Sequence, residues 1–258
     1  MNNYDYSYDD IVRCLKEVGL IKGDKIFIHS NIGFFGKLKD SFDSKDYYKK
    51  FKNAISEIIG KSGTIIVPTF SYSFTNNDVF DPNKTPSVCG MFSEMVRDDP
   101  EAIRSLDPNF SVTAIGPDAK FFTENSSNHS FDLNSFWDRF LRKNGKICNF
   151  NFDSGSTFFH YVEKTLNVPY RYDKKFSGTI LVNKKNIETT WIHFVFDHDQ
   201  KNLWPNFEKF HKKAKDLDLV NIVNLGKGQI TCISVRDTFD LIQNELRNNP
   251  AFLINGPL

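Results

Sequence analysis

The sequence lacks the features that mark membrane, secreted and nucleic-acid-binding proteins. It contains no apolar run as long as a membrane span, and its first residues, MNNYDYSYDD, carry no apolar signal region. Lys plus Arg number 33 and Asp plus Glu number 32, so neither sign of charge dominates. A chain without a basic excess has no electrostatic footprint for nucleic acid or an anionic membrane. We therefore expect a cytoplasmic protein with no nucleic-acid partner and no membrane partner.

Cysteine pairs and common enzyme motifs are also missing. The four cysteines form no CxxC pair, so we expect reduced thiols, mostly in the core, at Cys14, Cys89, Cys148 and Cys232. There is no G-x-S-x-G, Walker or G-x-G-x-x-G motif, which removes the usual hydrolase, nucleotide-triphosphatase and dinucleotide-binding signatures. The segment HFVFDHD (193–199) suits either a metal site or a solvated loop. We favour the loop and expect no metal.

An alternation of helical and strand patterns fills the first part of the chain. A helix capped by Ser7 and Asp10 precedes an apolar strand over 25–28, and a helix over 47–59 precedes a second strand over 64–67. This alternation predicts an α/β fold whose strands are at least partly parallel. In such sheets the ligand site lies beyond the carboxyl ends of the strands.

After the first two strands, the predicted helices and strands give way toward the C-terminus to successive strand-like segments. The sequence predicts a helix over 91–97, a strand over 146–150, and a turn, DSGST, that caps a helix over 157–166. From about residue 176, successive apolar segments suggest antiparallel strands; the predicted strands and helices there span 179–182, 190–195, 207–217, 229–235 and 238–246. We therefore predict one α/β domain, 1–258, with a mixed sheet, flanking helices and an antiparallel C-terminal extension.

Polar residues follow both N-terminal strands, where a ligand is expected. His29-Ser30-Asn31 ends the first strand, and Pro68-Thr69-Phe70 ends the second. Amides and hydroxyls at these ends can hold a polar ligand, although Ser and Asn also favour ordinary turns. A long loop, 71–90, comes next and carries Tyr72, Phe74 and Phe80. Long loops in compact domains are usually functional or disordered, and the aromatics favour an ordered loop that faces a ligand.

The segment STFFHYVEK contains a candidate catalytic pair. His160 and Glu163 are three residues apart on a predicted helix, so their side chains share a face. A carboxylate beside an imidazole fixes its tautomer and raises its basicity, so the pair can act as a general base. The same spacing also suits a surface ion pair or a hydrogen-bonded core histidine. Spacing alone does not choose between these interpretations.

Seven segments give the chain a more specific signature. In chain order they are GDKIFIHSNIGFFG, GTIIVPTFSYSF, FDPNKTPSVCGMFSEMVR, PEAIRSLDPNFSVTAIGP, SFWDRFLRKNGKI, GSTFFHYVEK and VPYR. In this order they resemble the aminoglycoside 3-N-acetyltransferase family, and weaker similarity continues through WPNFEKF to the final helix. The resemblance implies an acyl-CoA-dependent N-acyltransferase that needs no metal. It also implies an α/β fold of the family's own type.

The resemblance assigns roles to particular residues. The family's H-x-x-E pair falls on His160 and Glu163, which implies that His160 is the general base for direct transfer without an acyl-enzyme. The family's HSS falls on His29, Ser30 and Asn31, whose backbone and hydroxyls would contact the coenzyme A arm. Further expected cofactor contacts are Thr69, Ser105 and Ser111. Expected acceptor contacts are Phe70, Tyr72, Phe74, Asp81 and Asp107.

The acceptor is less clearly indicated, because the chain departs from the family pattern. Asn31 replaces the second serine of HSS, Asp107 stands where the family commonly has the histidine of RSxHP, and Phe110 replaces a usual polar residue. A site for a polycationic antibiotic benefits from excess acid, which this chain lacks overall. We therefore expect the acceptor to be a small amino sugar carried on a nucleotide diphosphate.

The loop aromatics bear on the same question. They could stack on the base of a nucleotide or on a sugar face, or they could simply pin the loop to the core. The alternative functions are aminoglycoside antibiotic 3-N-acetylation and non-catalytic binding of coenzyme A or a sugar. The expected partners are the two small molecules, acyl-CoA and the amino sugar, and a homodimer is left open.

Overall fold

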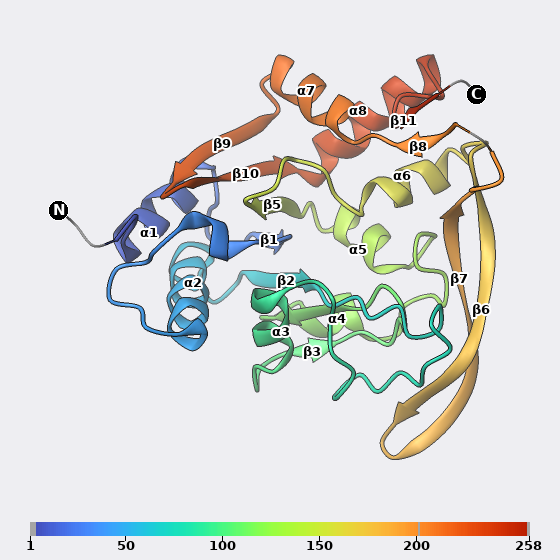
Figure 1. Ribbon diagram of the computed structural model, residues 1–258, viewed down its shortest axis with the longest axis horizontal. Helices are drawn as coiled ribbons and strands as arrows, with labels where there is room; N and C mark the ends of the chain where they lie inside the picture. The colour runs from blue at the N-terminus through green and yellow to red at the C-terminus, as the bar shows by residue number, and fades with distance from the viewer. Residues whose placement is uncertain (1–3, 201, 257–258) are drawn as a thin grey trace.

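The computed structural model describes residues 4–200 and 202–256 and is built around a seven-stranded sheet (Figure 1). The strand order is β3-β4-β2-β1-β5-β10-β9. The strands are β1 Lys25–Phe27, β2 Thr64–Pro68, β3 Ile103–Arg104, β4 Val112–Ile115, β5 Lys146–Phe150, β9 Val220–Leu225 and β10 Gly228–Ser234. β2, β1 and β5 pair in parallel, and the outer pairs are antiparallel. The predicted mixed α/β sheet with flanking helices is confirmed.

Helices cover both faces of this sheet because the central strands are apolar on both sides. In the segment that contains β1, Ile26 and Ile28 point to one face and Phe27 to the other, as the two-residue period of a strand requires. The first face packs against α1 Tyr8–Glu17, α2 Ser44–Ile59 and α3 Met91–Arg97. The second packs against α4 Ala119–Thr123, α5 Phe136–Arg142, α6 Phe159–Thr165, α7 Glu208–Asp216 and α8 Val235–Asn248.

Short polar side chains set where several helices begin. Ser7 and Asp10 form the predicted capping box of α1, and Asp43 caps α2 by accepting from the amide of Asp46. The predicted cap of α6 is different. This helix begins at Phe159 after the N-cap Phe158, which makes no side-chain capping bond. Ser156 of the DSGST turn lies two residues earlier, and its hydroxyl accepts from the amide of Phe158 at 3.3 Å.

The antiparallel extension begins earlier and is longer than the apolar segments indicated. β6 Arg171–Val182 and β7 Lys185–Phe196 pair along twelve residues each as a separate two-stranded sheet. This hairpin runs along the side of the molecule beyond α6 (Figure 1). The prediction from residue 176 missed its first residues because that stretch, RYDKK, is mostly exposed and polar.

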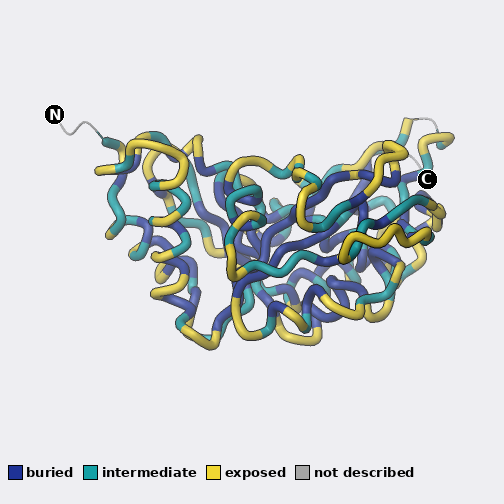
Figure 2. Tube along the Cα trace, turned by 90° about the horizontal axis from the view of Figure 1, so that it is seen from below, coloured by how far each residue is buried: buried dark blue, intermediate teal, exposed yellow. Residues whose placement is uncertain are grey.

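The last strands do not all join the hairpin. β9 and β10 complete the main sheet beside β5, and β8 Trp204–Pro205 pairs with β11 Ile254–Asn255. The main sheet therefore takes strands from both halves of the chain, and the single domain over 1–258 stays a prediction. Figure 2 shows buried segments running through the middle of the molecule with exposed turns at its periphery. In the described parts of the chain, no helix is both long and apolar enough to span a membrane.

Candidate functional site

A cleft of about 580 Å³ lies at the carboxyl ends of β1 and β2. It is bounded by the residues that follow these strands, by the end of the long loop, and by the first turn of α3. Its lining residues are His29, Ser30, Asn31, Ile32, Gly33, Pro68, Phe70, Tyr72, Val88, Cys89, Gly90, Met91, Phe92 and Phe152. The cleft is therefore where ligands bind in open α/β sheets, outside the carboxyl ends of the strands.

A second pocket of about 290 Å³ adjoins the cleft and shares His29 and Phe152 with it. Its other walls are Asp153, Gly155, Ser156 and Thr157 of the turn before α6, and Phe207 before α7. His29 thus lies where the two cavities meet. Together they offer an elongated site that reaches from the loop 71–90 toward the start of α6.

The backbone after β1 is held rigidly by β5 and the residues that follow it. The amide of Phe150 donates to His29 O at 2.8 Å, and the amide of Asn31 donates to Phe150 O at 2.9 Å. The side chain of Asn151 then donates to Asn31 O at 2.9 Å. By contrast, the buried hydroxyl of Ser30 has no hydrogen-bond partner among the described residues. Ser30 therefore lines the cleft, while its hydroxyl oxygen is buried below the cleft surface without a partner among the described residues.

The ring of His29 is kept neutral by its surroundings. Burial lowers its pKa from the ordinary value to about 4. The ring stands edge-on to Phe27 with centroids 4.9 Å apart, and its Nε2 lies 3.5 Å from Ser156 Oγ. His29 therefore offers an uncharged imidazole at the junction of the two cavities.

The predicted pair on α6 is in contact. His160 Nδ1 and Glu163 Oε2 are 2.8 Å apart, and the Glu163 side chain is fully buried. Nε of Arg171, the first residue of β6, lies 2.8 Å from the same carboxylate oxygen. Because the ionised carboxylate accepts at Nδ1, the imidazole carries its proton there and leaves Nε2 as an acceptor. Nε2 of His160 has no hydrogen-bond partner within 4–200 and 202–256.

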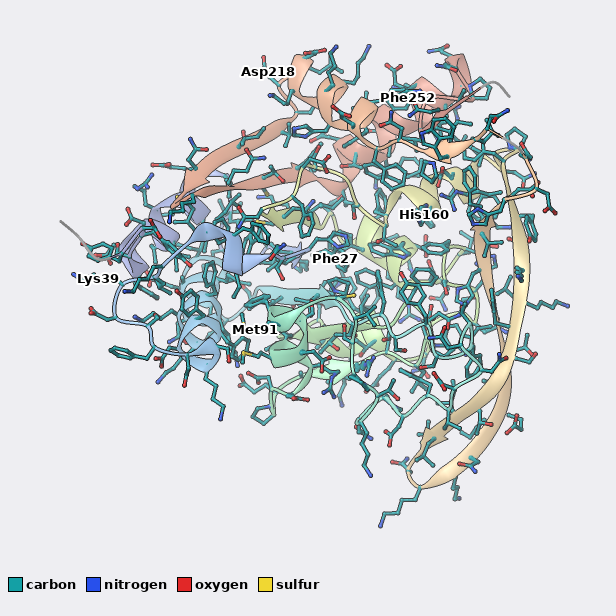
Figure 3. The ribbon with its side chains drawn as sticks, viewed as in Figure 1. Phe27, Lys39, Met91, His160, Asp218 and Phe252 are labelled. Atoms are coloured by element: carbon teal, nitrogen blue, oxygen red, sulfur yellow. The ribbon has the colours of Figure 1, made fainter. Side chains whose placement is uncertain are left out.

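Aromatic rings enclose His160 on two sides. Phe131 stands edge-on to the imidazole with centroids 5.3 Å apart, and Phe207 lies at 5.7 Å. Phe207 also lines the second pocket, whose lining residues do not include His160 itself. Figure 3 marks the position of His160 on α6. Burial lowers the pKa of His160, the positive charge of Arg171 lowers it further, and Glu163 acts against both. The imidazole is therefore neutral at neutral pH and able to accept a proton.

Several predicted contacts do not reach the cleft. Thr69 and Ser111 are fully buried between the strands, where Thr69 Oγ1 lies 3.0 Å from Thr113 Oγ1 and Ser111 Oγ donates to Thr69 O at 2.6 Å. The hydroxyl of Ser105 accepts from the amide of Val112 at 2.9 Å. These three hydroxyls serve internal hydrogen bonds, so their assignment to the cofactor stays a prediction that the cleft does not support.

The aromatics of the long loop divide into two groups. Phe74 and Phe80 are buried in a small core with Ile180 and Trp191 of the hairpin, so they pin the loop rather than face a ligand. Tyr72 is partly exposed and lines the cleft beside Phe70. Asp81 lies outside the lining of both cavities and accepts from the amide of Asn83 within the loop.

A partly buried arginine fastens this loop to the sheet. The guanidinium of Arg104 donates to Thr85 O at 2.5 Å and to Thr69 O at 2.6 Å, and it lies 4.9 Å from the ring centroid of Phe80. Its acceptors are neutral, namely backbone carbonyls and the hydroxyl of Ser111, and burial lowers its pKa to about 10. The hydrogen bonds of Arg104 therefore hold the part of the loop that leads to Val88 and Cys89, which line the cleft.

Asp107 belongs to a buried polar network that the sequence did not indicate. Its carboxylate accepts from the amides of Asn109 and Phe110 at 3.0 and 2.8 Å and from the hydroxyl of Ser130. Ser130 Oγ also lies 2.7 Å from Nδ1 of His193, whose Nε2 lies 2.9 Å from the Asn109 amide nitrogen. Asp107 thus ties three segments together and does not face the cleft.

The structure also settles the surroundings of the histidine-rich segment. His193 is buried on β7, while Asp197, His198 and Asp199 lie at and beyond its end. The favoured solvated loop therefore fits only the second half of HFVFDHD. Among the described residues there is no cluster of three or more His, Cys, Asp or Glu that could hold a metal. The cysteines are unpaired, and Cys14, Cys148 and Cys232 are buried as expected.

Several residues at the site carried no signal by themselves. Val88, Cys89, Met91, Phe152 and Phe207 line the cavities, but each looked like an ordinary loop or core residue in the sequence. Arg171 was visible only as the last letter of VPYR. A basic residue that soon follows a glutamate can indicate an ion pair, but only the fold shows that Arg171 and Glu163 are in contact.

The family model for aminoglycoside 3-N-acetyltransferase matches residues 27–247, which is most of the chain. The chain belongs to this family. It is accordingly an acyl-CoA-dependent N-acyltransferase, as the segments quoted above indicated. No curated protein sequence matches the chain significantly.

Solved structures share the fold. Aminoglycoside acetyltransferase AAC(3)-Xa is 17% identical, with a TM-score of 0.80 over 93% of this chain and 92% of that one. The structure described as AAC-IIIb binary with CoASH is 16% identical, with a TM-score of 0.79 over 94% and 96%. AAC-VIa bound to sisomicin is 22% identical, with a TM-score of 0.77 over 94% and 98%. At these identities the likeness establishes the fold alone.

Proposed function

We propose that this protein transfers an acyl group from acyl-CoA to an amine of an aminoglycoside, with His160 as the general base. The observation that carries the proposal is the contact of His160 with the buried Glu163, which leaves Nε2 as a proton acceptor. His160 does not itself line the second pocket, but its ring lies against Phe207, which does. An amine that attacks a thioester carbonyl must lose a proton, and a neutral imidazole can accept it. Glu163 stabilises the imidazolium that forms.

The cleft suits the extended arm of an acyl-CoA donor. It is long, largely apolar, and has neutral polar groups at Ser30 and Asn31. We propose that Ser30 contacts the donor by turning its buried, unpartnered hydroxyl into the cleft, because the amide of Asn31 and the hydroxyls of Thr69 and Ser111 already have partners. Placing donor and acceptor side by side supplies much of the rate through proximity.

The choice of an aminoglycoside rests on family membership and on the loop aromatics. AAC-VIa, which shares the fold, is described as bound to sisomicin. Two of the three aromatics that suggested nucleotide stacking, Phe74 and Phe80, are committed to the hairpin core. The main basis for a nucleotide-linked acceptor is therefore weakened.

One observation keeps the nucleotide-linked amino sugar as a second candidate. The cleft has no carboxylate among its described lining residues, and the second pocket has one, Asp153. A polycationic acceptor gains from nearby acid, whereas a nucleotide diphosphate does not. Tyr72 remains available to stack on a base or sugar face.

A thiol-release assay separates the candidates. Acetyl-CoA and longer acyl-CoA donors would be tested against aminoglycosides, thymidine-diphosphate amino sugars and simple amines. The ratio of kcat/KM values measures discrimination directly, and we expect it to favour an aminoglycoside. A higher value for the nucleotide sugar would make the second candidate correct. Absence of thiol release with every amine, in protein that binds coenzyme A, would leave only a binding function. We also propose a cytoplasmic location, because acyl-CoA is an intracellular metabolite.

A further inference from the structure

Glu163 makes two charged contacts through one oxygen. Oε2 lies 2.8 Å from His160 Nδ1 and 2.8 Å from Arg171 Nε. The exposed fractions are 0% for the Glu163 side chain and 5% for that of Arg171. A buried carboxylate of this kind is stable only when opposite charge and hydrogen bonds offset the loss of water. Arg171 supplies that opposite charge as an ion pair that lacks hydrogen-bond geometry, and His160 supplies the hydrogen bond. Oε1 of Glu163 has no hydrogen-bond partner among the described residues.

The net charge of this cluster decides whether His160 holds a proton. With Arg171 positive, Glu163 negative and the imidazole neutral, the three side chains sum to zero. Protonating His160 would leave a net positive charge in a desolvated site, which is unfavourable. Without Arg171, a neutral imidazole beside Glu163 would leave a net negative charge, and the pair would take up a proton at higher pH.

Tyr170 also acts on Glu163, but burial and the negative charge of Glu163 raise the pKa of this phenol, so it stays neutral. Only Arg171 and Glu163 act electrostatically on the ionisation of His160. The neighbours from other elements, Phe131 and Phe207, are uncharged rings. Lys164, the next residue of α6 after Glu163, is paired with Asp173 at 2.6 Å.

The position of Arg171 is fixed independently of Glu163. Its Nη1 donates to Phe194 O at 3.3 Å across the hairpin, and its guanidinium lies 5.5 Å from the ring centroid of Phe196. Both contacts come from β7. The hairpin therefore presents a fixed cation to the carboxylate of α6.

We propose that Arg171 is a positioning residue for the base: by engaging the same Glu163 oxygen as His160, it fixes the carboxylate and offsets its charge, so that the imidazole stays an unprotonated acceptor. This inference rests on the proposed role of His160. It gives the start of the hairpin a part in the reaction, although Arg171 touches neither substrate.

The test compares imidazole titration with catalysis in matched variants. The variants are Arg171→Met, Arg171→Lys, Glu163→Gln and the double variant Glu163→Gln/Arg171→Met, with Lys174→Met as the control. Lys174 is an exposed cation on the same strand, and its ammonium lies over the ring of Phe176. NMR would follow protonation of the His160 ring, and kcat/KM would be measured over the same pH range.

We expect Arg171→Met to raise the pH at which His160 takes up a proton by roughly one unit or more, the usual size of such an effect. The acidic limb of kcat/KM should move by the same amount. Arg171→Lys should restore most of the original titration, and Lys174→Met should not alter it. An unchanged imidazole titration in folded Arg171→Met would overturn the inference.

The two proposals fail in different ways. If the imidazole titration moves but the acidic limb of kcat/KM does not, Arg171 still controls His160, and the role of His160 as base is wrong. If Arg171→Met does not fold, the single and double Glu163→Gln variants decide. The single variant leaves an uncompensated guanidinium, so His160 should take up its proton at lower pH there than in the double variant. Equal titration in these two would refute the role of Arg171.

Discussion

Nε2 of His29 lies 3.5 Å from Oγ of Ser156, although the two residues are 127 positions apart in the chain. This contact joins the segment after β1 to the turn before α6. Because His29 and Phe152 line both cavities, the cleft and the second pocket meet at this point. His160 follows Ser156 by four residues and lies in the first turn of α6, so the proposed base is close in sequence to this junction.

Replacement of His160 tests the base most directly. His160→Ala should lower kcat by about a hundredfold or more, the usual size of general acid–base catalysis. Binding of acyl-CoA, measured by calorimetry, should change little. The matched control is His198→Ala, because His198 is exposed beyond the end of β7 and should be dispensable. Equal turnover in the two variants would remove His160 from its proposed role.

The pH dependence of kcat/KM follows from the lowered pKa of His160. The imidazole must be neutral to accept a proton, and burial together with Arg171 moves its pKa below the ordinary value of about 6.5. Activity should therefore persist at pH 6.5 and fall only at lower pH. A limb centred above pH 6.5 would contradict this assignment.

Two aromatics of the long loop should behave differently. Tyr72→Ala should raise the KM of one substrate and leave stability nearly unchanged, because Tyr72 lines the cleft and is partly exposed. Phe74→Ala should destabilise the protein by about 3–5 kcal/mol, typical of a buried phenylalanine. Kinetics and urea unfolding of both variants would check the contrast. A larger kinetic effect for folded Phe74→Ala would restore that residue to the acceptor site.

Asp107 should prove structural. Asp107→Ala would leave two backbone amides and the hydroxyl of Ser130 without their acceptor, at a cost of about 1–3 kcal/mol for each buried group left unsatisfied. The midpoint of urea unfolding should fall while KM values stay close to those of the wild type. A selective rise in the KM of the amine, without lost stability, would favour the predicted acceptor contact instead.

His29 should make stability depend on pH. Its folded pKa is depressed to about 4, so the unfolded state binds the proton first as the pH falls. The stability that neutral His29 contributes to the folded state is present above about pH 6.5 and is lost as the pH falls toward 4. Between pH 6.5 and 5 the wild type should lose about 2 kcal/mol more than His29→Gln, because one pKa unit corresponds to about 1.4 kcal/mol. Parallel losses in the two proteins, measured by urea unfolding, would show that His29 is not the titrating group.

The sequence predicted the central strands well and the long hairpin poorly. β1, β2 and β5 are short apolar runs between clear turn signals, so their pattern reflects burial on both faces. β6 carries exposed polar residues from Tyr172 to Lys175, and its strand is defined by pairing with β7 rather than by burial. The hydrophobic pattern of β6 alone cannot predict its pairing with β7.

The candidate site shows the same limit. His160 and Glu163 could be paired because three residues along a helix fix their relative position. Tyr72 and Phe74 could not be distinguished, since only the packing of the hairpin decides which ring faces the cleft. Arg171 could not be connected to Glu163 either, because the turn between α6 and β6 sets their distance.

The place of β5 in the sheet has a consequence for synthesis of the chain. β5 pairs on one side with β1 and on the other with β10, which comes about eighty residues later. Until residues 228–234 leave the ribosome, β5 is an open sheet edge with apolar residues at Ile147, Cys148 and Phe150, a form that invites association with other chains. Phe207 of the second pocket also follows β5 in the chain and is synthesised after it. The nascent protein should therefore depend on chaperones until β10 docks, and become active only after that step.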